Sequence, residues 1–273
     1  MHILTKTMTA LMLLTIVTTV AVFSCGKNND DDEDFIPEEG GGNDTISGGD
    51  NNDTIIIDSI TGDWVDLGLP SGLLWATYNL GAIVPEDFGD YFAWGEAIPK
   101  SHYDWSTYYH SRGNMYSLTK YCSIPDFGLL GFTDTFTILQ PIDDAASSYW
   151  GDSVHTPTYA EWEELLDNTT SQWTNYRGVS GRLFVARNHK LLFLPAAGCR
   201  NGSSLINAGS NGYYWSSSVY GEYPSFAWYF FVQIPATYLD DCYDNRSFGY
   251  TIRPVCRPTP VNDSLPINNT LRK

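Results

Sequence analysis

The chain has 273 residues, of which 15% are aromatic and 17% are charged, a balance typical of one sizeable folded domain and not of a disordered chain. Asp and Glu outnumber Lys and Arg by 32 to 15, and the net charge of -17 would repel polyphosphates, which excludes nucleic acid as a partner. Gly, Tyr, Trp, Ser and Thr are plentiful, a mixture that favours short strands joined by many loops.

The first residues have the pattern of an export signal. Lys6 precedes an apolar run over residues 8–23, which has the length of a signal-peptide core and is short for a membrane span. The run ends at Ser24-Cys25 and resembles the lipobox of bacterial lipoproteins. We therefore expect a signal peptide over residues 1–24 and a lipid anchor on Cys25 that holds the protein to a membrane. An ordinary secretory signal with a chance cysteine is the alternative.

Residues 25–60 are predicted to form a flexible acidic tether. Residues 27–60 contain eleven acidic residues against the single cation Lys27, and self-repulsion with Gly keeps such a chain extended. An acidic run directly behind the lipidated cysteine resembles the export signal of Bacteroidetes lipoproteins. It implies an outer-membrane protein that is lipid-anchored and exposed at the cell surface. A plain solvated spacer is the alternative.

A folded domain is expected over residues 61–260, followed by a tail over residues 261–273. Turn residues at 69–72 lead into an alternating strand pattern at 73–77. Aromatic residues in segment 86–96 have near-helical spacing but lie between glycines, so we expect irregular packing there. Residues 143–150 begin with acids suited to a helix N-terminus.

The best helix in the sequence starts after Thr158. Thr158 and Glu161 have the spacing of a capping box, and Trp162, Leu165 and Leu166 then fall on one helical face. Strand patterns follow at residues 182–186, 190–194, 212–217, 227–232 and 249–255. These elements predict an α+β domain with two helices packed on short antiparallel strands and long loops.

Six segments carry a family resemblance over roughly residues 64–256. They are VDLGLPSGLLWATYNLGA, GDYFAWGE, TPTYAEWEELLDN, FLPAAGCR, GYYWSSS and GYTIRPV. In this order they resemble the Fibrobacter succinogenes major paralogous domain (FISUMP) of Bacteroidetes lipoproteins. That family looks like a divergent branch of the C-type lectin-like fold, related in shape to the formylglycine-generating enzymes. The resemblance implies a C-type lectin-like domain. Members often have Cys where Tyr78 stands, so disulfide placement does not carry over.

The sequence gives little support for catalysis or cofactors. His102, His110, His155 and His189 lie at no metal-ligand spacing, and neither Glu-Pro-Asn nor Gln-Pro-Asp, the triplets that hold calcium in sugar-binding C-type lectins, occurs. The remaining cysteines, even in number in an exported protein, favour two disulfides with three possible pairings: Cys122, Cys199, Cys242 and Cys256. A remnant of the cysteine pair of the formylglycine-generating enzymes is the alternative.

The stretch from Tyr213 to Tyr250 is the candidate binding region. It mixes many aromatic residues with Ser, Asp and Asn, the composition of an antibody-like paratope. Strand alternation predicts that Trp215 and Trp228 lie in the core and that Tyr220, Tyr223, Tyr238 and Tyr243 are exposed. The predicted ligand-binding residues are Tyr214, Tyr220, Glu222, Tyr223, Ser225, Phe226, Tyr229, Tyr238, Asp240, Asp241, Tyr243, Asp244 and Ser247.

The resemblance also implies that the candidate region can be diversified, because some family members are targets of diversity-generating retroelements. We therefore predict a non-enzymatic surface lipoprotein, without cofactor or metal, that binds an extracellular protein or glycan. A calcium-independent glycan-capture protein and a structural or adhesive envelope protein are the alternatives. Arg253 is expected to pair with a buried acid such as Asp66 or Glu161, or to face the ligand.

Overall fold

The computed structural model of the chain describes residues 45–47, 54–56, 63–239 and 241–258. The predicted signal peptide, Cys25, Asp240 and the predicted tail all lie outside the described residues. In the described part, strands β1 (Thr45–Ser47) and β2 (Thr54–Ile56) pair with each other antiparallel. Across the same residues, no helix is both long and apolar enough to cross a membrane.

Strands from both ends of the folded part share one sheet. Strand β3 (Trp64–Asp66) pairs with β4 (Leu74–Ala76), and β15 (Val255–Cys256) lies between β4 and β5 (Val154–His155). Gly68 and Gly72 take positive φ in the connection between β3 and β4, where a side chain would strain the backbone. The predicted turn and strand at residues 69–77 are confirmed.

Both predicted helices are present, each has an N-terminal cap, and the predicted capping box of the second is confirmed. Helix α1 (Ala145–Trp150) is capped by Asp144, whose carboxylate accepts a hydrogen bond from the Ala146 amide at 2.9 Å. Helix α2 (Tyr159–Asn168) has the complete capping box of Thr158 and Glu161. It buries Trp162, whose ring stacks on Phe230 with centroids 4.4 Å apart and planes 5° apart. Local sequence signals therefore predicted where each helix begins.

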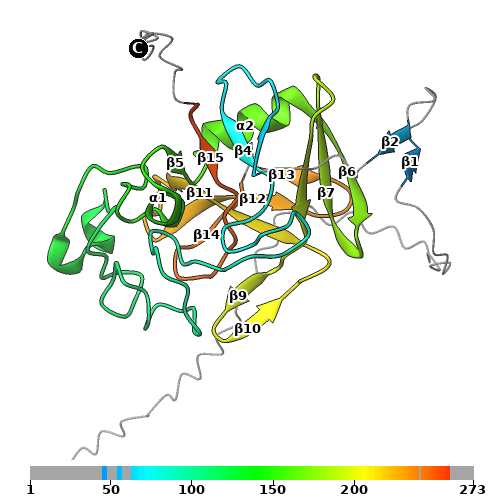
Figure 1. Ribbon diagram of the computed structural model, residues 1–273. Coiled ribbons are helices and arrows are strands. Elements are labelled where there is room, and N and C mark those ends of the chain that lie inside the picture. The colour runs from blue at the N-terminus through cyan, green and yellow to red at the C-terminus, as the bar shows by residue number, and fades with distance from the viewer. Residues whose placement is uncertain (1–44, 48–53, 57–62, 240, 259–273) are drawn as a thin grey trace, which may run out of the picture. The chain divides into compact units, whose positions relative to one another are not determined.

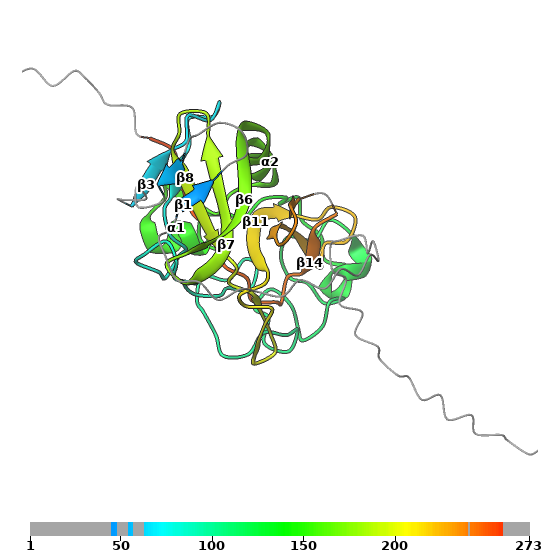
Figure 2. The same cartoon turned by 90° about the vertical axis from the view of Figure 1, so that its right-hand side faces the viewer.

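Two further antiparallel sheets form the body of the domain (Figures 1 and 2). One has the order β6 (Thr169–Tyr176), β7 (Val179–Ala186), β8 (Leu191–Pro195). The other joins β11 (Gly212–Val219) to β12 (Phe226–Val232), which also pairs with β13 (Thr237–Tyr238) and β14 (Tyr243–Asn245). Strands β9 (Cys199–Asn201) and β10 (Ser204–Ile206) form a projecting hairpin. The described part is thus an α+β domain of antiparallel strands with few helices, as predicted.

Several strands of the folded part were not predicted, and one predicted strand differs from the structure. The strands that were not predicted are β3, β5, β6, β9, β10, β13 and β14. Strand β6 was not predicted because its sequence, TTSQWTNY, has no apolar alternation, and its partner β7 supplies the buried side chains instead. Residues 249–254 do not form a continuous strand, since they make only isolated bridges at Tyr250, Thr251 and Gly249 before β15 begins. Their backbone bonds go to several different segments instead of one neighbour.

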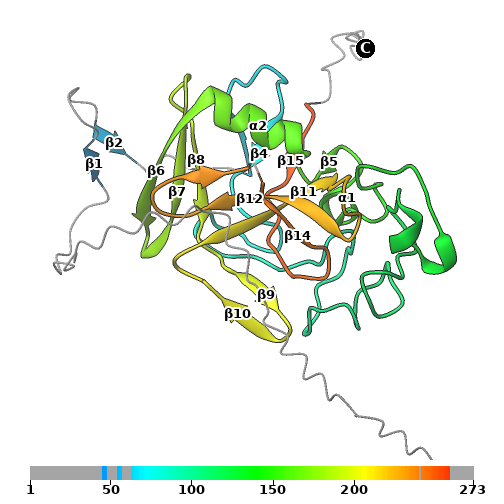
Figure 3. The same ribbon diagram turned by 180° about the vertical axis from the view of Figure 1, so that it is seen from behind.

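A long irregular segment, residues 77–144, connects β4 to α1 and holds only two short 3₁₀ turns, η2 (Pro125–Phe127) and η3 (Leu129–Gly131). Its loops gather at the end of the domain near β14 and α1 (Figures 1 and 3). They bury an aromatic cluster of their own, formed by Tyr91, Ala93, Tyr103, Tyr108, Leu118 and Cys122. The irregular packing predicted for residues 86–96 is confirmed.

Buried hydrogen bonds join all six quoted segments. The Trp162 indole donates to the Trp215 carbonyl at 3.3 Å, the Thr251 hydroxyl to the Tyr213 carbonyl at 2.9 Å, and Arg253 Nε to Asn79 Oδ1 at 2.9 Å. The Trp94 indole donates to the Ser216 carbonyl at 2.7 Å, and the Trp215 indole donates to the Phe92 carbonyl at 2.8 Å. The Tyr214 hydroxyl donates to the Pro195 carbonyl at 2.6 Å. Because these groups come from different segments and are all buried, each segment fixes the position of another.

Arg253 takes part in these hydrogen bonds, but without the acid that we expected. Its guanidinium donates to Asn79 Oδ1 at 2.9 Å and to the Ala76 carbonyl at 3.1 Å, and the side chain is fully buried. Burial lowers the pKa of Arg253 to about 10. Asp66 and Glu161 bond elsewhere, so the predicted acid pair is wrong, as is the alternative in which Arg253 faces a ligand.

Candidate binding surface

Part of the candidate region lies on the face of β12 that helix α2 partly covers. Phe230 is on this face beneath Trp162 of the helix, and strand alternation puts Trp228 and Phe226 on the same face. Helix α2 begins at Tyr159, whose ring packs on Trp228 with centroids 4.7 Å apart. The strand face beyond Trp228 therefore continues past the helix N-terminus, and Phe226 and Trp228 are only partly buried. Figures 1 and 3 show α2 lying across β11 and β12.

Four aromatic side chains stand together on this uncovered part, and we call them the aromatic column: Tyr220, Tyr223, Phe226 and Tyr243. The rings of Tyr220 and Tyr243 stack with centroids 3.8 Å apart and planes 5° apart. Tyr223 lies at 18° to Tyr220, and Phe226 lies at 22° to Tyr243, with centroids 6.1 and 6.0 Å apart. These three pairs are close to parallel, whereas Tyr223 and Phe226 are tilted by 43°. Tyr223, at 47% exposed, is the most open of the four rings.

Two aromatic side chains outside the predicted set hold the column in place. Trp228 meets Tyr220 and Tyr243 edge-on, at 88° and 89°, and it is the register partner of Tyr243 across β12 and β14. Phe127, from the long irregular segment, meets Tyr223 edge-on at 83°. Edge-to-face contacts of this kind stabilise aromatic clusters. No sequence pattern predicted that Phe127 contacts the column, because only the tertiary fold brings it there.

Four predicted site residues are instead buried core. Tyr214 and Tyr229 are 0% and 2% exposed, and Ser225 and Ser247 are also buried. Tyr214 lies beneath Trp162 of α2, while Tyr229 is on the opposite face of the sheet, against Tyr250. The burial of these four side chains contradicts their predicted contact with a ligand.

Asp244 and Tyr238 also depart from the prediction. Asp244 is opposite Ala227 in β12, so its carboxylate points away from the column and accepts a hydrogen bond from Tyr250 at 2.7 Å. Burial raises the pKa of this carboxyl. Tyr238 is half-buried beside Phe231, on the other face of β12 from Trp228. Trp228, predicted as core, is instead partly exposed, whereas Trp215 is buried as predicted.

Two exposed acids belong to the segments that carry these rings, and we call Glu222 and Asp241 the acidic rim. Glu222 Oε2 accepts a hydrogen bond from the Tyr220 hydroxyl at 3.2 Å, and Asp241 lies two residues before Tyr243. Desolvation and then the hydrogen bonds with Tyr243 and Glu222 raise the pKa of Tyr220 to about 12, so its hydroxyl keeps its proton at neutral pH. The predicted residues that the structure brings together are therefore Tyr220, Glu222, Tyr223, Phe226 and Tyr243.

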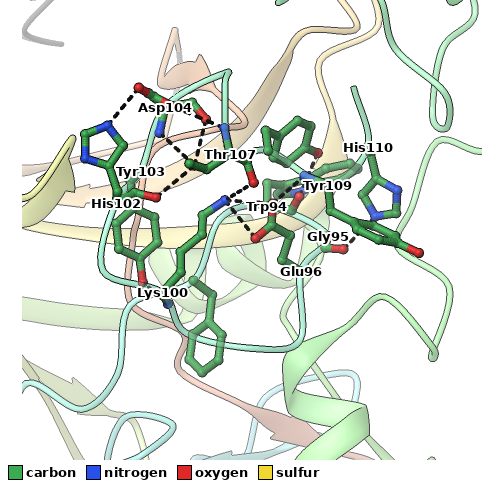
Figure 4. Close-up of polar contacts among 12 residues, drawn as sticks. Trp94, Gly95, Glu96, Lys100, His102, Tyr103, Asp104, Thr107, Tyr109 and His110 are labelled. Carbon is green, nitrogen blue, oxygen red and sulfur yellow. Dashed lines mark hydrogen bonds and ion pairs between the residues drawn. The ribbon is translucent and has the colours of Figure 1, made fainter. Parts of the chain in front are cut away.

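Polar contacts elsewhere in the described residues fix loops in place (Figure 4). Lys100 Nζ lies 2.9 Å from Glu96 and also donates to the Thr107 carbonyl at 3.0 Å. Glu96 also accepts from the Tyr109 amide at 2.8 Å. His102 bonds to Asp104 at 2.8 Å in the same loop. These contacts join successive turns of residues 94–110 to one another.

A second polar cluster is centred on Asp143, just before α1. Asp143 Oδ2 accepts from Lys120 Nζ at 2.5 Å and from the Tyr121 hydroxyl, and His110 Nε2 lies 3.7 Å from Oδ1. Desolvation lowers the pKa of His110. The neighbouring enclosed space has a volume of only about 10 Å³, which leaves room for at most one water molecule.

A shallow depression of about 440 Å³ lies over residues 81–90 and Val179. Its floor includes Glu86, which is held by Arg177 at 3.4 Å, and Asp87 and Asp90 are the other acids at its edge. Within the described part of the chain, no group of three His, Cys, Asp or Glu residues is arranged to hold a metal ion.

The cysteines differ from the predicted arrangement. Cys122, Cys199 and Cys256 are free thiols in the structure, so the two expected disulfides among the four C-terminal cysteines are not formed. Burial raises the pKa of Cys199 to about 12, and it also raises the pKa of Cys122 and Cys256. A raised pKa keeps a thiol in its unreactive protonated form.

A scan against protein-family models, a search of curated proteins and a search of solved structures found no match to the chain. The resemblance to the FISUMP domain therefore stays a prediction from the quoted segments.

Proposed function

We propose that this protein is a lipoprotein on the outer face of the bacterial outer membrane that binds an extracellular protein or glycan and catalyses no reaction. Its binding site is the aromatic column with its acidic rim. The observation that carries the proposal is that four partly exposed aromatic rings contact one another in one place on the surface. Exposed apolar groups gathered in one place mark interaction sites.

We further propose that the domain is a C-type lectin-like member of the FISUMP family. In support, buried hydrogen bonds join the six quoted segments, and two helices pack on antiparallel strands beside long loops. The diversified-region hypothesis concerns the surface positions Tyr220, Glu222 and Tyr223. Sequences from sister strains test it: these positions should vary more than residues 64–82, and equal variation would contradict it.

The lipid anchor has its own test. Cys25→Ser should move the protein from the membrane fraction to the soluble exported fraction. External protease should remove the wild-type domain from intact cells if the protein is displayed at the surface. Retention of Cys25→Ser in the membrane, or full protection from protease, would contradict the anchor or the display respectively.

The binding test compares the full wild-type chain with the variant Tyr220→Ala/Tyr223→Ala/Tyr243→Ala on glycan arrays and on arrays of purified extracellular proteins. The exposed Tyr109→Ala is the matched control, because its ring contacts His110 and lies apart from the column. We expect a ligand that the triple variant loses and the control keeps. If every ligand is kept by a folded triple variant, the aromatic column is not the site, and a structural envelope role becomes the better interpretation.

A further inference from the structure

We propose that the ligand of the aromatic column is a cationic, arginine-bearing segment of a protein. This inference rests on the proposed function, because it names the chemistry of the partner that the same surface takes. It would make protein recognition, and not glycan capture, the role of the site.

The first argument is charge. The sequence has no Lys, Arg or His between Arg200 and Arg246, while the exposed acids Glu222 and Asp241 fall in that interval. Arg246 itself is fully buried and bonded to loop carbonyls, so it does not offset the surface acids from the outside. The segments that carry the tyrosines of the column therefore present only negative charge.

The second argument is that these surface acids lack cationic partners. None of the ion pairs among the described residues includes Glu222, Asp241 or Asp126, and all three are exposed. Asp126 precedes Phe127, which contacts Tyr223, and Asp241 lies two residues before Tyr243. Acids without cations at the edge of an apolar surface favour a positively charged partner.

The third argument is the way the rings are oriented. Tyr220 stacks directly on Tyr243, Trp228 meets both rings at nearly 90°, and the Tyr220 hydroxyl bonds to Glu222. A sugar stacks on an open, flat aromatic face, and the stack closes one such face on Tyr220 and one on Tyr243. Tyr223, at 47% exposed, is the most open ring of the column.

Arginine matches both features of the site. Its planar guanidinium stacks on an aromatic face such as that of Tyr223 and donates paired hydrogen bonds to a carboxylate such as Glu222. A lysine ammonium offers the same charge but neither the planar stack nor the paired bonds. The surface should therefore prefer arginine to lysine, which separates specific docking from simple charge attraction.

The test measures binding of synthetic peptides to the full chain by calorimetry. The peptides alternate Ser with Arg, Lys or Glu, and cellohexaose serves as a neutral glycan probe. The ring variant is Tyr220→Ala/Tyr223→Ala/Tyr243→Ala, and the acid variant is Glu222→Gln/Asp241→Asn. The charge-matched control is Asp87→Asn/Asp152→Asn, at exposed positions outside the column. All variants keep the acidic tether, whose charges attract cationic peptides nonspecifically, and near-ultraviolet circular dichroism verifies their fold.

We expect the Arg-Ser peptide to bind the wild type several-fold more tightly than the Lys-Ser peptide. The Glu-Ser peptide should not displace the bound Arg-Ser peptide. The ring and acid variants should each weaken Arg-Ser binding by about tenfold, and the control should not. Equal binding by all variants would assign the peptide to the tether and overturn the inference. If the wild type binds cellohexaose but not the Arg-Ser peptide, and the ring variant loses cellohexaose, the inference is overturned. The proposed binding surface would then still stand. Absence of Arg-Ser binding also overturns it, and the array experiment then decides the proposed function separately.

Discussion

The ring of Tyr220 lies flat on the ring of Tyr243, with centroids 3.8 Å apart and planes 5° apart. Tyr220 follows the last residue of β11, and Tyr243 is the first residue of β14. The contact therefore ties β14 to the loop that follows β11. Tyr243→Ala should lower the free energy of unfolding by about 2 kcal/mol, since it removes both the stack and the edge contact with Trp228. Tyr243→Phe keeps the ring and should cost under about 0.5 kcal/mol. Urea denaturation measures both, and equal effects would show that the hydroxyl matters and the stack does not.

Alkaline pH should destabilise the domain through its tyrosines. Burial raises the pKa of Tyr91 to about 12, and the pKa of Tyr220 is also about 12, both above the ordinary value of 10.0. A raised folded-state pKa contributes stability that is complete below pH 10 and is lost as pH rises toward 12. The free energy of unfolding should therefore fall over that interval. Phenolate absorbance should show delayed ionisation in the folded protein, and ionisation of all tyrosines at the ordinary pKa would contradict this expectation.

The buried Arg246 should be among the least replaceable residues. Its guanidinium donates to the Tyr108 hydroxyl at 2.8 Å and to the carbonyls of Pro224, Tyr121 and Lys120 at 2.7 to 3.1 Å, and it lies 4.7 Å from the Trp94 ring centroid. Arg246→Lys should lower the free energy of unfolding by about 3 kcal/mol, because an ammonium cannot donate to all of these groups. The same change at exposed Arg257 is the control and should be near neutral in thermal unfolding.

The capping box of α2 gives a prediction about local stability. The Thr158 hydroxyl accepts from the Glu161 amide at 3.2 Å, and Glu161 accepts from the Thr158 amide at 2.8 Å. Thr158→Ala should cost about 1 kcal/mol, while Thr158→Ser should restore most of it. Because α2 begins beside Trp228, fraying of its first turn should also alter tryptophan fluorescence. If the amides of α2 keep their wild-type protection from hydrogen exchange in Thr158→Ala, the stabilising role of the capping box is contradicted.

The three free thiols should differ in reactivity. Cys256 is only partly buried, whereas Cys122 and Cys199 are buried, with the pKa of Cys199 at about 12. Iodoacetamide at neutral pH should therefore alkylate Cys256 first, and the other two only after unfolding. Mass spectrometry of peptides after timed labelling measures the order, and Cys256→Ser should remove the early adduct. Labelling of Cys199 in the native protein at the rate of Cys256 would show that its burial is incomplete.

Local signals in the sequence determined where the helices begin and where β4, β7, β8, β11 and β12 lie. Capping requires residues three apart, and strand alternation requires residues two apart, so both patterns are complete within a few positions. Thr158, Glu161 and Asp144 therefore predicted α1 and α2 correctly. The sequence also located the candidate region, since its tyrosines and acids are concentrated between Tyr213 and Tyr250.

Only the tertiary structure decided which of those side chains are open. Alternation divides β11 and β12 into two faces, but what covers each face is set by elements distant in the sequence. Trp162 of α2 covers Tyr214, and Tyr250 covers Tyr229. Trp228 and Phe226 are partly exposed because α2 begins beside them. The same long-range packing brought Phe127 to Tyr223 and gave Arg253 the carbonyl of Ala76 in place of an acid. Composition fixes which rings are available, and burial by distant segments decides which of them can meet a ligand.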